Sequence, residues 1–344
     1  MTMHSYISDN PLNTIDVAKE VQPHLFCSVP RIYEKVYSNF VSAIESKAVL
    51  RIGLKIPFVS ELLKKKLKSA AGFGNLKFAI SGAAPINSKI LTLFQTLGIP
   101  LFEGYGMTEN TAGATLNFID NNKIGTVGKA LPNTQIKIAK DGEVLIKGDH
   151  VMKGYYRNEK ATSETIIDDW LYTGDVGKID SDGYLSITGR KKEIYVSSSG
   201  KNIAPLVIEE TMKSIPIVSQ CYLVGDDRKF CSALITLDMG VILRDYIGIN
   251  VNEIPKDPIK QNELIISNNK KLSDFTDNKD IFNFVSDEIE KLNQKFSNPE
   301  QVKKFSILPR DFSIDEGELT PTLKIRRKQI NDNWSEVISS MSSE

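Results

Sequence analysis

The sequence predicts an α/β protein with a parallel sheet and a β-rich subdomain, followed by a small α+β carboxy-terminal domain. Residues 76–106 alternate between short apolar runs and one helical pattern, which is typical of parallel strands joined by a crossover helix. Beyond residue 120, Asp-Gly pairs separate short apolar runs and indicate antiparallel hairpins. We expect the α/β portion to span 1–120, the β-rich subdomain 121–190 and the carboxy-terminal domain 191–344.

The composition is that of an ordinary globular protein, and 344 residues suffice for about two domains with a substantial core. Lys plus Arg and Asp plus Glu each number 43, so no net field attracts nucleic acid or an anionic membrane, and only a local charged patch could do so. Cys27, Cys221 and Cys231 lack metal-ligand spacing, which predicts free thiols in a reducing compartment. We find no signal-like start and no apolar run of about 20 residues, so we expect a cytoplasmic protein.

Residues 14–68 are expected to be helical because apolar residues recur at three- and four-residue spacing, with Pro23 and Pro30 separating the helices. At the end of this segment the lysines of 64–68 share an amphipathic stretch with Leu62 and Leu67. A solvated basic face is the favoured interpretation of these lysines. Peripheral contact with a membrane is the alternative.

Residues 76–106 are predicted to form a strand at 76–80, a helix at 86–97 and a second strand at 99–102. Parallel sheets bind ligands beyond the carboxyl ends of their strands, so the loops after the two strands lie on one edge. The first loop contains the small residues Gly82, Ala83 and Ala84, which would let a flat ring approach the backbone. Tight packing of helix against strand explains these small residues equally well.

The second loop, residues 102–110, is the stretch around which the chain is organised. Gly104 and Gly106 free the backbone for a tight turn, and Thr108 and Glu109 follow at once. Beside a nucleotide, the threonine hydroxyl could bond a phosphate oxygen and the carboxylate could hold Mg²⁺. Taken alone, the stretch is also compatible with an ordinary surface turn.

Two hairpins are predicted in the β-rich subdomain, at 135–147 around Asp141-Gly142 and at 176–188 around Asp182-Gly183. Between them, Trp170–Asp175 is expected to be an aromatic-flanked turn that ends in a carboxylate. Asp175 could accept hydrogen bonds from two vicinal sugar hydroxyls, or it could simply mark the start of a strand without binding a ligand.

The charged segment Gly189–Glu193 is interpreted as a domain boundary. Ser197–Lys201 lacks the glycine spacing of a phosphate-binding P-loop, and we reject that assignment. The tail is predicted to contain a helix at 206–212, a hairpin at 220–237 turning at 226–229, a polar stretch at 250–280, a helix at 281–296 and an apolar run at 305–308. On pattern alone, Lys324 begins a solvated basic helix.

Several of these stretches, in this order, resemble the adenylate-forming family of acyl-CoA synthetases, in particular the long-chain fatty acid–CoA ligases. The resemblance covers nearly the whole chain and rests on the set of motifs together. The stretches are Gln22–Arg31, Ser81–Pro85, Gly104–Glu109, Tyr172–Asp175, Gly189–Glu193, Ser198–Asn202 and Pro321–Lys324.

The resemblance implies ATP-dependent ligation of a long-chain fatty acid to coenzyme A through an acyl-adenylate, with Mg²⁺ as the metal. It assigns the adenine pocket to the loop from Gly82 to Ala84, with Tyr105 stacking on the ring within the Gly104–Gly106 turn. Thr108 would hold the α-phosphate and Glu109 would serve Mg²⁺.

The later motifs imply the remaining roles. Asp175 would accept the ribose hydroxyls with help from Arg190, and Lys324 would approach the reacting carboxylate and phosphate. Lys192 aligns with the family's hinge, about which the carboxy-terminal domain swings so that the strand-loop with Gly200 and Lys201 replaces Lys324 and admits the thiol. A plain surface lysine is the alternative interpretation of Lys192.

One family feature is missing from the 344 residues, the Ser/Thr/Gly-rich phosphate loop that precedes the first resembling stretch. The resemblance therefore implies a partial large domain. The chain is then either a fragment of a longer ligase or a shortened protein with impaired adenylation. A non-catalytic remnant that binds AMP or acyl-adenylate is the main alternative, and an aryl or amino acid substrate is another. Oligomeric state and acyl chain length are left open.

Overall fold

The structure, a computed structural model, describes residues 5–6, 13–198, 200–226, 230–255, 257–320 and 324–341. The chain divides into two compact units. The first unit comprises Met1–Thr173 with Gly177–Ile187, and the second comprises Gly174–Val176 with Thr188–Glu344. The predicted three-part division at residues 120 and 190 stays a prediction.

The first unit contains a sheet with the order β1-β2-β3-β4-β5, in which β1, β2 and β3 are parallel. Strands β4 and β5 continue the sheet in antiparallel pairing. The strands are β1 (Leu25–Ser28), β2 (Phe78–Ser81), β3 (Leu101–Tyr105), β4 (Thr115–Leu116) and β5 (Lys129–Ala130). The α/β class and the parallel strands at 76–106 are therefore confirmed.

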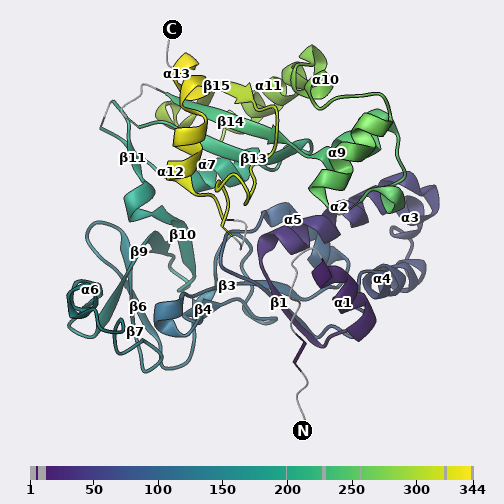
Figure 1. Ribbon diagram of the computed structural model, residues 1–344. Coiled ribbons are helices and arrows are strands. Elements are labelled where there is room, and N and C mark those ends of the chain that lie inside the picture. The colour runs from purple at the N-terminus through teal and green to yellow at the C-terminus, as the bar shows by residue number, and fades with distance from the viewer. Residues whose placement is uncertain are drawn as a thin grey trace. The chain divides into compact units, whose positions relative to one another are not determined.

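The helices beside this sheet are α1 (Thr14–Val21), α2 (Pro30–Ser46), α3 (Ala48–Gly53), α4 (Val59–Ala70) and the crossover helix α5 (Ser88–Thr96) (Figure 1). Helix α5 begins where the Asn87 side chain accepts a hydrogen bond from the Lys89 amide at 2.9 Å. Side chains of α2 and α5, including Tyr33, Val36 and Phe94, share one buried core with Ala79 of β2. That core packs α2 and α5 against the sheet.

Two sequence predictions in this unit are corrected. Residues 25–28 are strand β1 and not helix, because parallel pairing with β2, with Leu25 opposite Phe78, outweighs the local helical pattern. Strand β3 also runs on through Gly104 and Tyr105, which pair with Leu116 and Thr115 of β4. The turn therefore starts after Tyr105, later than the sequence predicts.

A second sheet in the β-rich part has the order β10-β9-β7-β6, and β8 pairs with β9. Its elements are β6 (Gln135–Ile138), β7 (Glu143–Lys147), α6 (Glu159–Thr165), β8 (Ile166–Ile167), β9 (Trp170–Ile179) and β10 (Leu185–Arg190). The hairpin at Asp141-Gly142 is confirmed, since β6 and β7 are antiparallel. The turn predicted at Trp170–Asp175 is wrong, because these residues lie inside strand β9. Their side chains alternate between more buried and less buried positions, as expected for a strand.

The second unit is built on a sheet with the order β13-β14-β15. Strands β13 and β14 form the predicted hairpin, and residues 227–229 of its turn lie outside the described residues. Cys221 and Leu223 of β13 join the core with α7 and α11, while Tyr222 between them joins the core with α12 and α13. Because successive strand residues face opposite sides, helices cover both faces of this sheet (Figure 1).

The elements of the second unit are η3 (Lys191–Glu193), β11 (Tyr195–Val196), β12 (Asn202–Ile203), α7 (Pro205–Met212), β13 (Val218–Val224), β14 (Cys231–Leu237), α8 (Met239–Val241), the π turn η4 (Ile242–Ile247), η5 (Val251–Glu253), α9 (Pro258–Ser267), α10 (Ser273–Thr276), α11 (Lys279–Asn293), η6 (Asn298–Glu300), β15 (Val302–Ile307), α12 (Arg327–Asn333) and α13 (Ser335–Ser340). The helices predicted near 206–212 and 281–296 are confirmed as α7 and α11. The polar stretch 250–280 contains α9 and α10. Among the helices of the described residues, none has the length and apolarity that a membrane crossing requires.

Candidate functional site

The two loops singled out by the sequence start side by side at the sheet edge. Ser81, the last residue of β2, pairs with Glu103 of β3 in parallel register. A Cβ added to Gly82 would lie 3.6 Å from the Gly104 carbonyl oxygen. Ala83 and Ala84 are exposed, and Ala83 has a left-handed backbone with φ of 69°. The structure thus confirms that both loops leave one edge, and the first loop presents small, open backbone there.

A close backbone approach fixes the turn after β3. A Cβ at Gly106 would fall well inside van der Waals contact of the Ala112 carbonyl, so only glycine fits without a shift. Thr111 and Ala112 are both left-handed, with φ of 57° and 63°. Such strained backbone is costly and persists only where the surrounding contacts enforce it.

The turn η2 (Thr108–Asn110) follows at once and displays the predicted pair. The buried Asn110 side chain accepts a hydrogen bond from the Met107 amide at 2.8 Å and so closes the turn from below. Thr108 is exposed and Glu109 is half-buried. The hydroxyl and the carboxylate are therefore held in fixed positions on a short, anchored turn.

Tyr155 is a neighbour of Glu109 that the sequence did not reveal. Its hydroxyl donates to Glu109 Oε1 at 2.8 Å, and the Met152 amide donates to the Glu109 carbonyl at 2.7 Å. Desolvation and the adjacent Glu109 carboxylate raise the pKa of Tyr155, which keeps the phenol a donor. One carboxylate oxygen is thereby oriented by the protein. Contacts 46 residues apart in sequence carry no local pattern that could have predicted this.

Two buried polar atoms near these loops lack a hydrogen-bond partner in the described part of the chain. They are Ser81 Oγ and Asn110 Nδ2. Such groups are uncommon in native proteins, and a bound polar ligand or an ordered water is a partner that could satisfy them. Within the same described residues, no cluster of three or more His, Cys, Asp or Glu could hold a metal alone. A magnesium ion there would use Glu109 together with phosphate oxygens and water, which suits its ligand preferences.

Glu103 is a second group that the sequence did not single out. It lies on β3 next to Gly104, is 7% exposed, and accepts hydrogen bonds from the backbone of Ile86 and Gly125. Burial raises the pKa of Glu103 to about 7, although the two backbone hydrogen bonds act in the opposite direction. A buried carboxyl with a pKa near neutrality therefore lies on β3, three residues before Gly106.

In the second unit, Asp175 and Arg190 form an ion pair. Arg190 Nε lies 3.1 Å from Asp175 Oδ1, and the aspartate side chain is 7% exposed against 56% for the arginine. Gly174 before it has a left-handed φ of 71° with open space where a Cβ would stand. The structure thus brings together the two residues that the resemblance assigns to ribose binding.

The predicted hinge residue Lys192 is exposed in η3, and its neighbour is firmly tied. Glu193 Oε2 lies 3.3 Å from Arg327 Nε, while the Arg327 guanidinium also donates to buried Glu209 at 2.6 and 3.0 Å and to the Tyr195 hydroxyl at 3.2 Å. The pattern interpretation of a solvated basic helix is wrong for Arg327, whose side chain is 16% exposed. Its buried acidic partner, 118 residues away, is visible only in the fold.

Gly200 and Lys201 lie in the loop between β11 and β12, which are antiparallel. Gly200 is left-handed with φ of 77°, and the Lys201 carbonyl accepts from the Ser197 amide at 2.9 Å. Lys201 Nζ donates to Ser297 Oγ and, at 3.0 Å, to Glu300 Oε2. Ser199 lies outside the described residues. Lys201 therefore holds this loop to η6.

Lys324 closes a loop whose base is well defined, while Pro321–Leu323 lie outside the described residues. The Thr320 amide donates to the Lys324 carbonyl at 2.8 Å, and the Lys324 amide donates to Thr320 Oγ1 at 3.0 Å. Leu319 and Ile325 form a bridge below them. The Lys324 side chain is exposed, and no ion pair forms from its ammonium within the described part of the chain.

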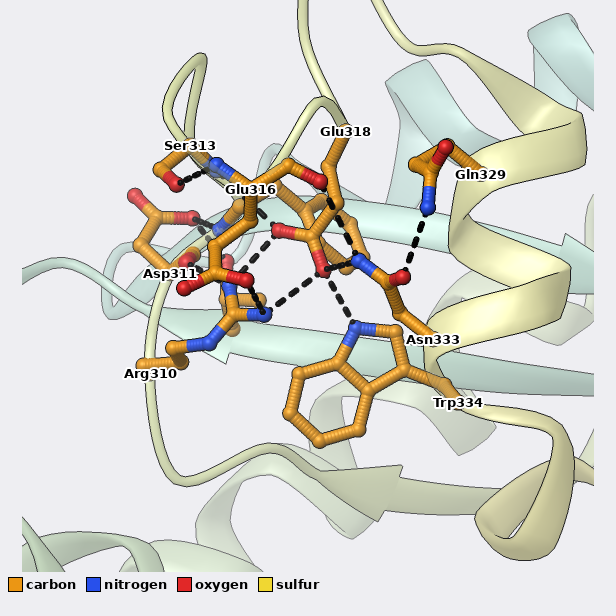
Figure 2. A network of polar contacts seen from close by, with 10 residues as sticks. Arg310, Asp311, Ser313, Glu316, Glu318, Gln329, Asn333 and Trp334 are labelled. Atoms are coloured by element: carbon orange, nitrogen blue, oxygen red, sulfur yellow. Dashed lines mark hydrogen bonds and ion pairs between the residues drawn. The ribbon is translucent and has the colours of Figure 1, made fainter.

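Glu318 anchors that base through the network in Figure 2. Its carboxylate, 0% exposed, accepts from Arg310 at 2.6 and 2.9 Å, from Trp334 Nε1 at 2.8 Å and from Asn333 Nδ2 at 3.1 Å. Burial by itself raises the pKa of Glu318, but these hydrogen bonds outweigh it and hold the pKa below its ordinary value. Glu318 also accepts from the Ser313 amide, so a buried charge fixes the chain two residues before Thr320.

The fold of this chain is similar to that of solved adenylation domains. The solved structures that this chain resembles include the A-PCP didomain of carboxylic acid reductase from Segniliparus rugosus in complex with AMP, with TM-score 0.67 and 20% identity over 98% of this chain and 44% of that one. The adenylation domain of a carboxylate reductase from Mycobacterium chelonae matches with TM-score 0.71 and 16% identity over 98% of this chain and 49% of that one. At these identities the likeness concerns the fold.

Family models assign the chain more specifically. The AMP-binding enzyme family matches residues 1–156, and the AMP-binding enzyme C-terminal domain matches residues 192–245. The chain belongs to the AMP-binding enzyme family. Curated relatives include long-chain-fatty-acid–CoA ligase FadD15 of Mycobacterium tuberculosis, 34% identical over 96% of this chain and 56% of the relative, and long-chain-fatty-acid–CoA ligase ACSBG2 of Gallus gallus, 31% identical over 94% and 47%. The chain thus spans about half the length of the curated relatives it matches.

Proposed function

We propose that this protein acts in the ATP-dependent ligation of a long-chain fatty acid to coenzyme A through an acyl-adenylate. The observation that carries the proposal is the pairing of two loops at one sheet edge, with Gly82 beside Gly104 and the anchored Thr108-Glu109 pair beyond. Support also comes from relatives at 34% identity that are named long-chain-fatty-acid–CoA ligases. Division at residues 120 and 190 into α/β, β-rich and mobile carboxy-terminal domains is part of the same proposal.

The chemistry explains why such a site needs these groups. A carboxylate is a poor electrophile, and attack of its oxygen on the α-phosphorus of ATP expels pyrophosphate and gives an acyl-adenylate whose AMP is a good leaving group. Negative charge gathers on phosphoryl and carboxylate oxygens in that step, so fixed donors and cations accelerate it. Attack of the coenzyme A thiolate on the acyl carbon then expels AMP and forms the thioester.

For the adenylation step, we assign the adenine of ATP to the loop of Gly82, Ala83 and Ala84, with Tyr105 against the adenine ring. The open backbone of this loop and the orphaned Ser81 hydroxyl beside it support this assignment. Thr108 donates to the α-phosphate. Mg²⁺, when bound, offsets phosphate charge, and the Glu109 oxygen not engaged by Tyr155 is the ligand we assign to it.

The second unit supplies the remaining groups in this proposal. Asp175, held by Arg190, accepts the ribose hydroxyls, and the exposed Lys324 ammonium offsets charge on the reacting carboxylate and phosphate. Lys192 is the hinge residue, and the loop of Gly200 and Lys201 serves the thiol step. Since Lys201 is engaged with Ser297 and Glu300, its role is to hold this loop in shape.

The proposal includes a cytoplasmic location and, because long-chain fatty acids partition into membranes, peripheral contact with a membrane surface. Its test measures the two half-reactions separately. Pyrophosphate release is followed with ATP, Mg²⁺ and oleate, and oleoyl-CoA is followed after addition of oleoyl-adenylate and coenzyme A. We expect Lys324→Ala to slow the first half-reaction by roughly 100-fold and to spare the second. Exposed Lys328→Ala is the matched control.

AMP binding distinguishes the alternative of a non-catalytic binder. Asp175→Ala removes a buried acceptor and is expected to weaken AMP binding by roughly 10-fold or more, since hydrogen bonds to charged groups contribute about 1.5 to 3 kcal/mol. AMP binding that depends on Asp175, without either half-reaction, would establish the binder. A chain that neither binds AMP nor forms oleoyl-CoA refutes the proposed function.

A further inference from the structure

Helices α3 and α4 pack against each other as a hairpin (Figure 1). Leu54 and Leu67 pack against the core of the first unit, and a Cβ at Gly53 would lie 2.6 Å from Leu63 Cδ1. The two helices therefore pack closely on each other and on the unit beneath. This inner face is ordinary protein core.

The outer face of the hairpin is apolar and exposed. We name it the hairpin face, and its residues are Val49, Ile52, Ile56, Phe58, Val59 and Leu62. Phe58 is 93% exposed, Val49 75% and Leu62 70%. Scattered exposed apolar residues need no explanation, but here six large ones lie within 14 consecutive residues of one hairpin.

Phe58 stands at the tip under local strain. Its φ is 66°, a left-handed backbone that an aromatic residue rarely adopts, and the Val59 amide closes a tight turn by donating to the Pro57 carbonyl at 2.9 Å. Neither the strained backbone of Phe58 nor the exposure of its ring stabilises the folded chain by itself. An aromatic ring held outward in this way suits insertion into an apolar medium.

The same segment carries a dense positive charge in a chain of zero net charge. Residues 47–70 contain seven Lys and Arg against a single Glu. Lys65 and Lys66 follow Leu62 by three and four positions on α4, so they lie one helical turn from it on the same side. Both are exposed, as are Arg51 and Lys55 on the other arm of the hairpin.

We propose that the hairpin face docks on a membrane with anionic headgroups, with Phe58 and its apolar neighbours entering the interface and the lysines behind them contacting lipid phosphates. An apolar face backed by Lys and Arg is the combination that anionic lipid attracts, and lysine side chains can extend toward the headgroups. The inference deepens the membrane contact in the proposed function and rests on it for its purpose. Docking itself requires no turnover.

The test is co-sedimentation with vesicles, either phosphatidylcholine alone or with about one third phosphatidylglycerol. We expect binding to the anionic vesicles that weakens as salt is raised. Lys65→Glu with Lys66→Glu should weaken this binding by at least about tenfold, and Phe58→Ser with Leu62→Ser should weaken it similarly. The matched control is Lys270→Glu with Lys271→Glu, two exposed lysines in the second unit, and it should bind like the parent.

The inference is overturned if the protein does not bind anionic vesicles, or if neither pair of hairpin substitutions weakens that binding. A dimer in analytical ultracentrifugation that dissociates in Phe58→Ser with Leu62→Ser, without vesicle binding, assigns the face to a second copy and overturns it as well. Hairpin-dependent vesicle binding by a chain that forms no oleoyl-CoA leaves the docking surface intact and refutes only the ligase function.

Discussion

Replacement of Glu318 by alanine tests how the base of the Lys324 loop is held. The carboxylate is fully buried and receives two bonds from Arg310, one from Trp334 and one from Asn333 (Figure 2). Breaking a buried ion pair by removing one partner typically costs about 3 to 5 kcal/mol. Arg310 is 35% exposed and regains water, so we expect the lower end, about 3 kcal/mol of unfolding free energy.

The measurement is urea unfolding followed by tryptophan fluorescence, because Trp334 stacks on Arg310 with the guanidinium carbon 5.0 Å from its ring centroid. Glu316→Ala is the matched control. Its carboxylate is 58% exposed and 3.8 Å from Arg310, so its loss should cost less than about 0.5 kcal/mol. Equal stability of the two variants would refute the anchoring role of Glu318.

The pH dependence of stability gives a second readout for Glu318. Its pKa in the folded state is lowered, so its stabilising contribution is fully present above the pKa of the unfolded chain, about 4.3, and is lost as pH falls through the folded value. We expect the parent to lose part of its stability below about pH 4 and Glu318→Ala to lose less over the same range. Parallel acid curves for the two proteins would contradict this assignment.

Three further predictions concern Glu103, Gly106 and Arg327. The folded-state pKa of Glu103 is raised to about 7, so the free energy of unfolding of the parent falls as pH rises from about 4.5 to 7. Relative to the parent, Glu103→Gln should therefore gain about 2 to 3 kcal/mol of unfolding free energy between pH 5 and 8, measured by urea unfolding. A difference between the two proteins that stays constant with pH would contradict this prediction. Gly106→Ala forces the Ala112 backbone to move and should cost about 1 to 3 kcal/mol by thermal unfolding, an effect that a neutral variant would disprove. Arg327→Met leaves buried Glu209 unpaired and should cost about 3 to 5 kcal/mol in the same assay, whereas no loss would show that the pair is dispensable.

The sequence predicted the elements whose signals are local. Asp141-Gly142 specifies its hairpin because such pairs favour the turn that matches strand twist, and β6 and β7 pair as expected. The apolar spacing of 86–97 gave α5, and that of 281–296 gave α11. The order of the motifs was sufficient to place the chain in its family, which the family models confirm.

Where long-range pairing competes with local pattern, the sequence prediction failed. Strand β1 lies in a segment with helical spacing, and it is a strand because it pairs with β2. The paired residues Leu25 and Phe78 are 53 positions apart in the sequence. Gly104 and Gly106 predicted a turn, yet Gly104 pairs with Leu116 and the turn begins later. Glycine permits both conformations, so the partner strand decides.

The sequence by itself supplied the prediction of the site residues, because Thr108, Glu109, Asp175 and Lys324 belong to motifs that can be recognised without coordinates. Only the tertiary structure showed Tyr155 beside Glu109 and Glu318 at the base of the loop of Lys324. The physical reason is that hydrogen bonds and ion pairs depend on distance in space, and those that span dozens of residues leave no periodicity in the chain. The strength of such buried pairs also depends on burial, which the packed fold alone establishes.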